Sequence, residues 1–225
     1  MTDLNQLLLK FDLKQNYKNE DFYVNKSNFF AFNLIDQWPR WEKNILNVHG
    51  EKYSGKTHLS NIFKKKNKAV KFKASEFNNN NLKEFKIYEN LILDDFDEHI
   101  DEKLMYTLFN IADQDNKYIL INSLTPINQI NFKLKDFISR TKNCIFAKIE
   151  KPDDELMFAI LLKNFSDRQI TIEKKLIDFI IKRIDRSYGK IYEFIYKIDE
   201  ISLKKKKPID FKIIKEVLED KFAQI

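Results

Sequence analysis

The chain has few of the features expected of a secreted or membrane-spanning protein. Its 225 residues include a single cysteine, Cys144, which excludes an internal disulfide and favours a reducing, cytoplasmic setting. No apolar run approaches the roughly 18 residues that a membrane span needs, so no membrane segment is expected. The first residues do not combine a basic segment with an apolar one, so no secretory signal is expected either.

Glycine and arginine are also scarce. Only 3 residues are glycine, whereas about 7% is usual. Of the 40 basic residues, 5 are arginine, at positions 40, 140, 168, 183 and 186. A chain so poor in these residues is expected to keep them where no other side chain does the same work. Gly50 and Gly55 stand five positions apart, the spacing of the two glycines in a phosphate loop.

The charge is positive but well mixed. The net charge is +6 and the sequence pI is about 9.1, values that fit a nucleic-acid or acidic partner. Acidic residues nevertheless total 34. The densest basic runs, residues 64–66 and 204–207, lie where helices are expected to end and where cations favour the helix dipole. Direct DNA binding is therefore expected to be weak or absent.

Up to about residue 150, short apolar runs alternate with segments of helical periodicity. Strands are predicted at residues 45–48, 69–73, 91–93, 118–121 and 144–149. Helices are predicted at 28–37, 57–66, 101–113 and 134–140, and the polar run 78–81 is predicted to be a loop. This alternation is typical of a parallel five-stranded sheet with helices on both faces.

Beyond Pro152 the pattern becomes helical throughout. Helices are predicted at residues 153–166, 173–185, 188–201 and 209–222, with Asp153 and Thr171 as N-caps. The predicted fold class is therefore α/β followed by a small all-helical lid. The predicted divisions are an N-terminal arm at 1–19, a nucleotide-binding α/β domain at 20–151 and a lid domain at 152–225.

Residues 50–57 fit the phosphate-loop pattern G-x-x-x-x-G-K-[ST] without a mismatch. Glycine lets backbone N–H groups approach a phosphate closely, and the following helix directs its positive end at the anion. Lys56 is predicted to reach the terminal phosphates, and the Thr57 hydroxyl is predicted to hold Mg²⁺. Chance is the alternative, and the scarcity of glycine argues against it. The predicted nucleotide contacts here are Gly50, Glu51, Lys52, Tyr53, Ser54, Gly55, Lys56, Thr57 and His58.

Two carboxylates follow the apolar run at 91–93. In open parallel sheets, ligands gather at the carboxyl ends of the strands. Asp94 is predicted to hold Mg²⁺ through water, and Asp95 to orient or deprotonate the attacking water. A solvated pair of turn residues is the alternative, and the phosphate loop upstream makes the metal site the stronger interpretation.

These motifs, with a helical lid after them, resemble the AAA+ branch of the P-loop ATPases, and more closely DnaA. Residues 22–28 resemble the segment that this family places beside the adenine. Residues 55–59 resemble its loop-to-helix junction, and residues 93–95 its acidic motif. The resemblance covers roughly residues 20–225 and implies a bound ADP or ATP with Mg²⁺.

Within that family, three features resemble the DnaA-related regulatory inactivators of the Hda group. The sequence ends after the lid, where DnaA adds a DNA-binding domain. Residues 75–90 are few for the two-helix DNA-gripping insertion of an initiator. Residues 6–11 resemble the sliding-clamp-binding peptide, which implies clamp contacts through Gln6, Leu7, Leu9 and Phe11. An arm packed on its own domain is the alternative.

The same resemblance suggests roles for later residues. Arg140, in a Ser-Arg pair, matches the arginine finger that acts on a neighbour's nucleotide, and a surface salt bridge is the alternative. Asn122 is the choice for a polar sensor of the γ-phosphate, and either Arg186 or Lys190 for the positive group of the lid.

The implied function is control of replication initiation. The chain would dock on the sliding clamp and stimulate ATP hydrolysis by DnaA, with at most weak ATPase activity of its own. A homodimer is left open. The alternatives are a DNA-binding AAA+ ATPase of the initiator or helicase-loader type and a small-molecule kinase.

Overall fold

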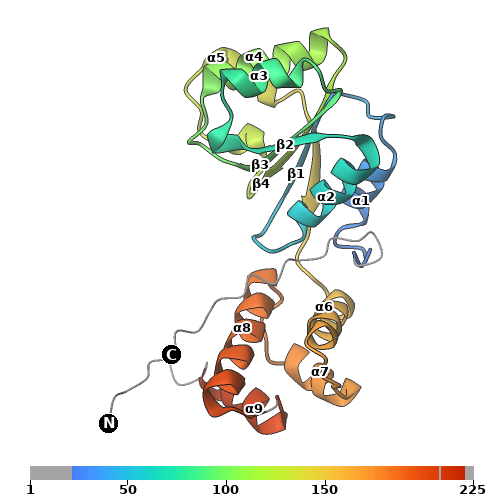
Figure 1. The fold of residues 1–225 in the computed structure, drawn as a ribbon, viewed down its shortest axis with the longest axis vertical. Coiled ribbons are helices and arrows are strands. Elements are labelled where there is room, and N and C mark those ends of the chain that lie inside the picture. The colour runs from blue at the N-terminus through green and yellow to red at the C-terminus, as the bar shows by residue number, and fades with distance from the viewer. Residues whose placement is uncertain (1–21, 208, 221–225) are drawn as a thin grey trace.

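The structure is a computed structural model that describes residues 22–207 and 209–220 (Figure 1). Five parallel strands form one sheet in the order β2-β3-β4-β1-β5. The strands are β1 (Ile45–Gly50), β2 (Val70–Lys73), β3 (Asn90–Phe96), β4 (Tyr118–Ser123) and β5 (Ile145–Ile149). The predicted five-stranded parallel sheet is confirmed.

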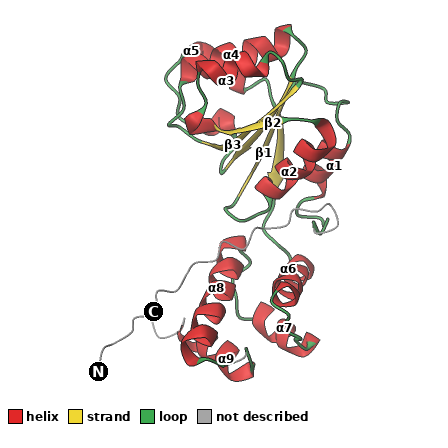
Figure 2. Cartoon of the chain, in the orientation of Figure 1, coloured by secondary structure: helices red, strands yellow, loops and turns green. Residues whose placement is uncertain are grey.

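Helices cover both faces of this sheet (Figure 2). One face carries α1 (Phe29–Asp36) and α2 (Lys56–Asn67), and the other carries α3 (Asn79–Phe85), α4 (Glu102–Gln114) and α5 (Lys135–Thr141). Successive strand residues point to opposite faces. Leu46, Val48 and Ile92 therefore pack with α2, whereas Leu91 and Leu93 pack with α4. Strands buried on both faces explain the short, wholly apolar runs in the sequence.

The lid contains α6 (Asp154–Asp167), α7 (Lys174–Ile181), α8 (Tyr188–Lys205) and α9 (Phe211–Asp220). It has a hydrophobic core of its own, built from all four helices. The predicted N-cap Asp153 is confirmed, since its side chain accepts a hydrogen bond of 2.9 Å from the Leu156 N–H. The prediction for Thr171 is wrong, because α7 begins only at Lys174. Ile170 and Ile172 pack against the lid core, and residues 170–173 are not helical.

The loop predicted at residues 78–81 is also wrong, because this run begins a helix. The Asn78 side chain accepts hydrogen bonds from the N–H groups of Asn80 and Asn81, and the Asn81 side chain accepts one from the Asn78 N–H. This reciprocal cap starts α3. Between residues 75 and 90 the chain holds this one α-helix of 7 residues, in keeping with the expected absence of a two-helix insertion.

The predicted arm at residues 1–19, with its clamp-binding residues Gln6, Leu7, Leu9 and Phe11, lies outside the described residues. Among the helices that the structure describes, none is long and apolar enough to cross a membrane.

Candidate functional site

The phosphate loop joins the end of β1 to the start of α2, and both of its glycines are sterically required. Gly50 has φ +155°, and a Cβ there would lie 2.8 Å from the Ile149 carbonyl oxygen. Gly55 has φ +95°, and a Cβ there would lie 3.0 Å from the Phe22 ring. Other residues rarely adopt such backbone angles. Phe22 stacks on Phe32 and meets His58 edge-on, so an aromatic group from the segment before α1 covers the loop-to-helix junction.

Lys56, the first residue of α2, turns back into the loop. Its Nζ donates hydrogen bonds to the carbonyl oxygens of Gly50 (2.7 Å) and Glu51 (2.8 Å). Burial lowers the pKa of Lys56, and the carboxylates of Asp94 and Asp95 oppose that shift. The ammonium group is therefore held by loop carbonyl groups and coupled electrostatically to the two acids near the end of β3.

Asp94 is the centre of a polar cluster under the loop. Asp94 as a whole residue is 7% exposed, and each oxygen atom of its carboxylate accepts a hydrogen bond. Oδ1 accepts from Asn122 Nδ2 at 2.9 Å, whereas Oδ2 accepts from Lys71 Nζ at 2.7 Å and from Thr57 Oγ1 at 3.3 Å. Burial raises the pKa of Asp94, but the hydrogen bonds from Lys71 and Asn122 and the Lys71 charge bring it below its ordinary value. The structure thus brings together three predicted residues, namely Thr57, Asp94 and Asn122.

The oxygen atoms of Thr57 and Asp94 suit Mg²⁺, which prefers oxygen ligands and retains several waters. No group of three or more histidine, cysteine or acidic side chains among the described residues forms a metal cage. A bound Mg²⁺ would therefore take most of its ligands from phosphate and water. The pairing of Lys71 with the same Asp94 oxygen was not predicted. The available signal was a lysine in the short strand β2, which pairs with the largely buried strand β3.

Asp95 leaves the sheet ladder immediately after Asp94. The register between β3 and β4 shifts between Leu93 and Phe96, and Asp95 has φ +53°. Such a bulge turns one side chain away from the regular alternation. Asp95 is consequently exposed while Asp94 is buried. Its predicted role toward an attacking water stays a prediction.

Asn122, at the end of β4, is held toward Asp94 and α2. Its Nδ2 also donates to Ser60 Oγ at 2.6 Å, and its Oδ1 is buried without a partner among the described residues. Ser54, within the loop, is likewise buried, and its hydroxyl has no partner in the part of the chain that the structure describes. Unpaired buried polar atoms are costly, so both are candidates to contact a bound ligand.

The lid touches the loop through contacts that we call the loop–lid clasp, formed by Glu51, Tyr53, Ser187 and Tyr192. The Glu51 carboxylate accepts hydrogen bonds from Ser187 Oγ and from the N–H groups of Tyr188 (3.3 Å) and Gly189 (3.4 Å), at the start of α8. A carboxylate there also favours the helix dipole. The Tyr53 and Tyr192 rings stack with centroids 4.0 Å apart and planes inclined by 7°. The sequence predicted Glu51 and Tyr53 as nucleotide contacts but gave no sign of this packing.

The three predicted cations outside the loop each face a carboxylate. Arg140, on α5, donates to Asp113 of α4 at 2.6 Å. Arg186 forms two hydrogen bonds of 3.0 Å with Asp154. Lys190 Nζ lies 3.0 Å from Glu193 Oε2. Each of these side chains thus has a carboxylate partner outside the loop, and their functional roles stay predictions.

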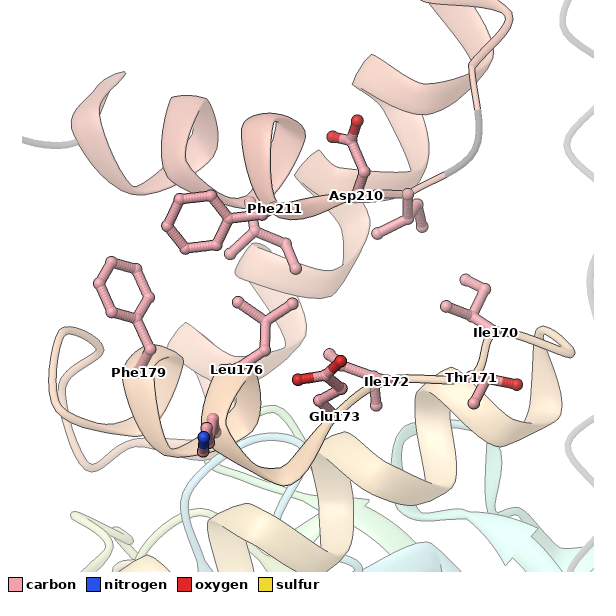
Figure 3. Close-up of a pocket in the computed structure, with 11 residues that line it drawn as sticks. Ile170, Thr171, Ile172, Glu173, Leu176, Phe179, Asp210 and Phe211 are labelled. Atoms are coloured by element: carbon pink, nitrogen blue, oxygen red, sulfur yellow. The ribbon is translucent and has the colours of Figure 1, made fainter.

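A cavity of about 450 Å³ lies elsewhere, within the lid (Figure 3). Leu176, Phe179 and Phe211 point toward one another across it, and the carboxylates of Glu173 and Asp210 lie on its margin. This cavity separates α7 from the start of α9, and none of its lining residues belongs to the phosphate loop.

Comparisons with known proteins agree with this architecture. Residues 153–218 match the family model described as Hda, lid domain. The chain is 27% identical, over 235 residues and 92% of its length, to the chromosomal replication initiator protein DnaA of Caldanaerobacter subterraneus subsp. tengcongensis. It spans about half the length of that relative, 53%.

Solved structures of DnaA share the fold. Domain III of Thermotoga maritima DnaA has a TM-score of 0.74 at 21% identity, covering 93% of this chain and 98% of that one. AMPPCP-bound DnaA from Aquifex aeolicus has a TM-score of 0.70 at 18% identity, covering 95% and 71%. The likeness confirms the predicted AAA+ type of α/β domain followed by a helical lid.

We predict that Tyr192→Ala weakens the loop–lid clasp. Stacked aromatic pairs contribute about 0.5–1.5 kcal/mol, so the melting temperature should fall by about 1–5 °C. Tyr196→Ala is the matched control, because Tyr196 lies exposed on the same helix without an aromatic partner among the described residues. In a double-mutant cycle measured by calorimetry, Tyr53→Ala should add little to Tyr192→Ala. Fully additive losses would contradict the stacking.

Proposed function

We propose that this chain, a DnaA-related AAA+ protein close to Hda, binds an adenine nucleotide at residues 50–57 and regulates replication initiation by acting on DnaA. The observation that carries the nucleotide site is the loop itself. Two glycines with positive φ hold a backbone turn at the start of α2, with Lys56 and Thr57 in its first turn. The N-terminal end of a helix favours anions, and the loop adds an ammonium group.

Further support comes from the groups around the loop. The buried Ser54 hydroxyl lacks a partner among the described residues, and a phosphate oxygen would supply one. Thr57 Oγ1 lies 3.3 Å from Asp94 Oδ2, so two oxygen atoms of the kind that Mg²⁺ prefers lie together beside the loop. Phe22 and His58 add aromatic surface beside Gly55, where the segment at residues 22–28 is proposed to meet the adenine.

We predict that Lys56→Ala weakens the binding of ADP and ATP by about 10- to 100-fold, the range expected for losing a hydrogen bond to a charged group. Isothermal titration calorimetry measures this loss. Lys64→Ala is the matched control, because Lys64 is an exposed lysine in the last turn of the same helix. If Lys56→Ala bound adenine nucleotide as well as the parent protein, the phosphate-loop assignment would be wrong.

Arg140 is proposed to act as the arginine finger toward the nucleotide of DnaA. Its side chain is 38% exposed, and its partner Asp113 is 34% exposed. Ion pairs as exposed as this one contribute little net stability, so the guanidinium can exchange Asp113 for a phosphate at low cost. The planar guanidinium can engage two phosphate oxygens at once, which an ammonium group does less well.

We predict that Arg140→Ala abolishes stimulation of DnaA while leaving nucleotide binding by the chain itself unchanged. Fingers supplied by a partner accelerate hydrolysis by about 10³–10⁵ in GTPase systems, so a loss of a hundredfold or more is expected. The measurement is ATP hydrolysis by purified DnaA with the chain and the DNA-loaded sliding clamp. Arg183→Ala serves as the control, since Arg183 is a lid arginine lying over the Phe179 ring. Equal stimulation by both variants would exclude the finger role.

The arm at residues 6–11 is proposed to dock on the sliding clamp. A glutamine that anchors by hydrogen bonds and apolar side chains that fill a pocket are the groups that a binding hot spot needs. We predict that the combined change Gln6→Ala and Phe11→Ala removes capture by purified clamp in a pull-down, whereas Lys10→Ala retains it. Capture that survives the combined change would remove the clamp from the proposal and leave the nucleotide site unaffected.

A further inference from the structure

Lys71 is a lysine inside the sheet domain that no part of the phosphate-loop pattern calls for. In the pairing of β2 with β3, Lys71 lies opposite Ile92, and Lys73 lies opposite Asp94. Their neighbours Val70 and Phe72 pack on the α4 side, so Lys71 lies on the α2 side with Ile92 and Asp94. From there its ammonium group reaches along the strands to Asp94 Oδ2, at 2.7 Å.

This contact differs in kind from the surface ion pairs of the chain. The Lys71 and Asp94 side chains are only 20% and 10% exposed. By contrast, Lys73 on the same strand and face pairs loosely with Glu76 at 3.8 Å, with exposures of 60% and 71%. A partly buried pair is screened little by solvent or salt. The positive charge of Lys71 is therefore a fixed part of the site, where it offsets the negative charge of Asp94.

The carboxylate of Asp94 is the group through which the protein would hold a hydrated Mg²⁺. Its Oδ2 atom, which faces Thr57, already carries a cation, and its Oδ1 atom accepts from Asn122. An additional divalent ion would meet the like charge of Lys71. A nucleotide without metal would instead meet the Lys56 ammonium group beside an Asp94 carboxylate whose negative charge Lys71 already offsets.

We propose that Lys71 acts as a built-in counter-ion that takes over much of the electrostatic role of Mg²⁺, so that the chain binds adenine nucleotide nearly as well without a divalent cation. This inference rests on the proposed nucleotide site and defines its metal requirement. Lys71 is a positioning and specificity residue here, because it acts through Asp94 and through its charge. A purely structural counter-ion would stabilise the fold and leave the metal requirement unchanged, which separates the two roles.

The test is isothermal titration calorimetry with ADP, in excess MgCl₂ and in excess EDTA. For the parent protein, the two dissociation constants should agree within about threefold, whereas Lys71→Met should bind at least about tenfold more tightly with Mg²⁺ than with EDTA. Lys71→Arg keeps the charge and should resemble the parent protein. Lys73→Met is the matched control, with the same substitution on the same strand and face, and should also resemble it.

The expected signature is a gain of metal dependence, which a partly unfolded variant does not produce. A strong Mg²⁺ dependence of the parent protein overturns the inference without any variant. A Lys71→Met protein that folds and shows the parent's metal response overturns it as well. If the parent protein binds no ADP either with MgCl₂ or with EDTA, the proposed nucleotide site is wrong, and the inference about Lys71 fails with it. Binding that is present but strongly metal-dependent overturns only the role of Lys71.

Discussion

The turn from β1 into α2 is the constraint on which the rest of the site depends. Within five residues the backbone must leave a fully buried central strand and begin a helix whose first N–H groups stay available. Gly50 passes so close to the Ile149 carbonyl oxygen, and Gly55 so close to the Phe22 ring, that neither position accepts a Cβ without displacement. Because the turn is tight, Lys56 and Thr57 open α2 directly above the ends of β3 and β4. The strand-end acids can therefore face the loop.

Charge at this edge is balanced by residues from four separate elements. Lys56 begins α2, Lys71 lies on β2, and Asp94 and Asn122 lie near the carboxyl ends of β3 and β4. Desolvation disfavours each charged group alone, as the lowered pKa of Lys56 indicates, and the opposite charges offset that cost. The loop carbonyl groups hold the Lys56 ammonium group, and the donors Lys71, Asn122 and Thr57 hold the Asp94 carboxylate. A bound polyphosphate would therefore replace partners that these charged groups already have. It would not enter a site that holds an unpaired buried charge.

The lid is an independent core that is coupled to the loop. Its four helices enclose their own apolar cluster, but Tyr188 at the start of α8 is buried against the sheet domain, and its hydroxyl donates to the Glu150 carbonyl oxygen at 3.0 Å. Together with the loop–lid clasp, this contact ties the start of α8 to the loop and to the end of β5. A movement of the loop on binding a phosphate would therefore displace the start of α8. These contacts are a physical route by which binding at the loop can move the lid.

Signals between neighbouring residues in the sequence determined much of the fold and part of the candidate site. The strand periods, the phosphate-loop spacing and the acids after residues 91–93 depend on neighbouring residues and on backbone sterics, and they predicted the parallel sheet, the helical lid and the meeting of Thr57 with Asp94. The prediction of a loop at residues 78–81 was wrong because a polar residue such as Asn78 can also cap a helix. The prediction of an N-cap at Thr171 was wrong because the packing of Ile170 and Ile172 outweighed the capping preference of threonine. Tertiary structure alone decided that Lys71 reaches Asp94 and that Glu51 and Tyr53 meet the lid. These partners lie 23, 136 and 139 positions apart in the sequence, so no local pattern relates them, and only the packing of β2 on β3 and of α8 on the loop brings them into contact.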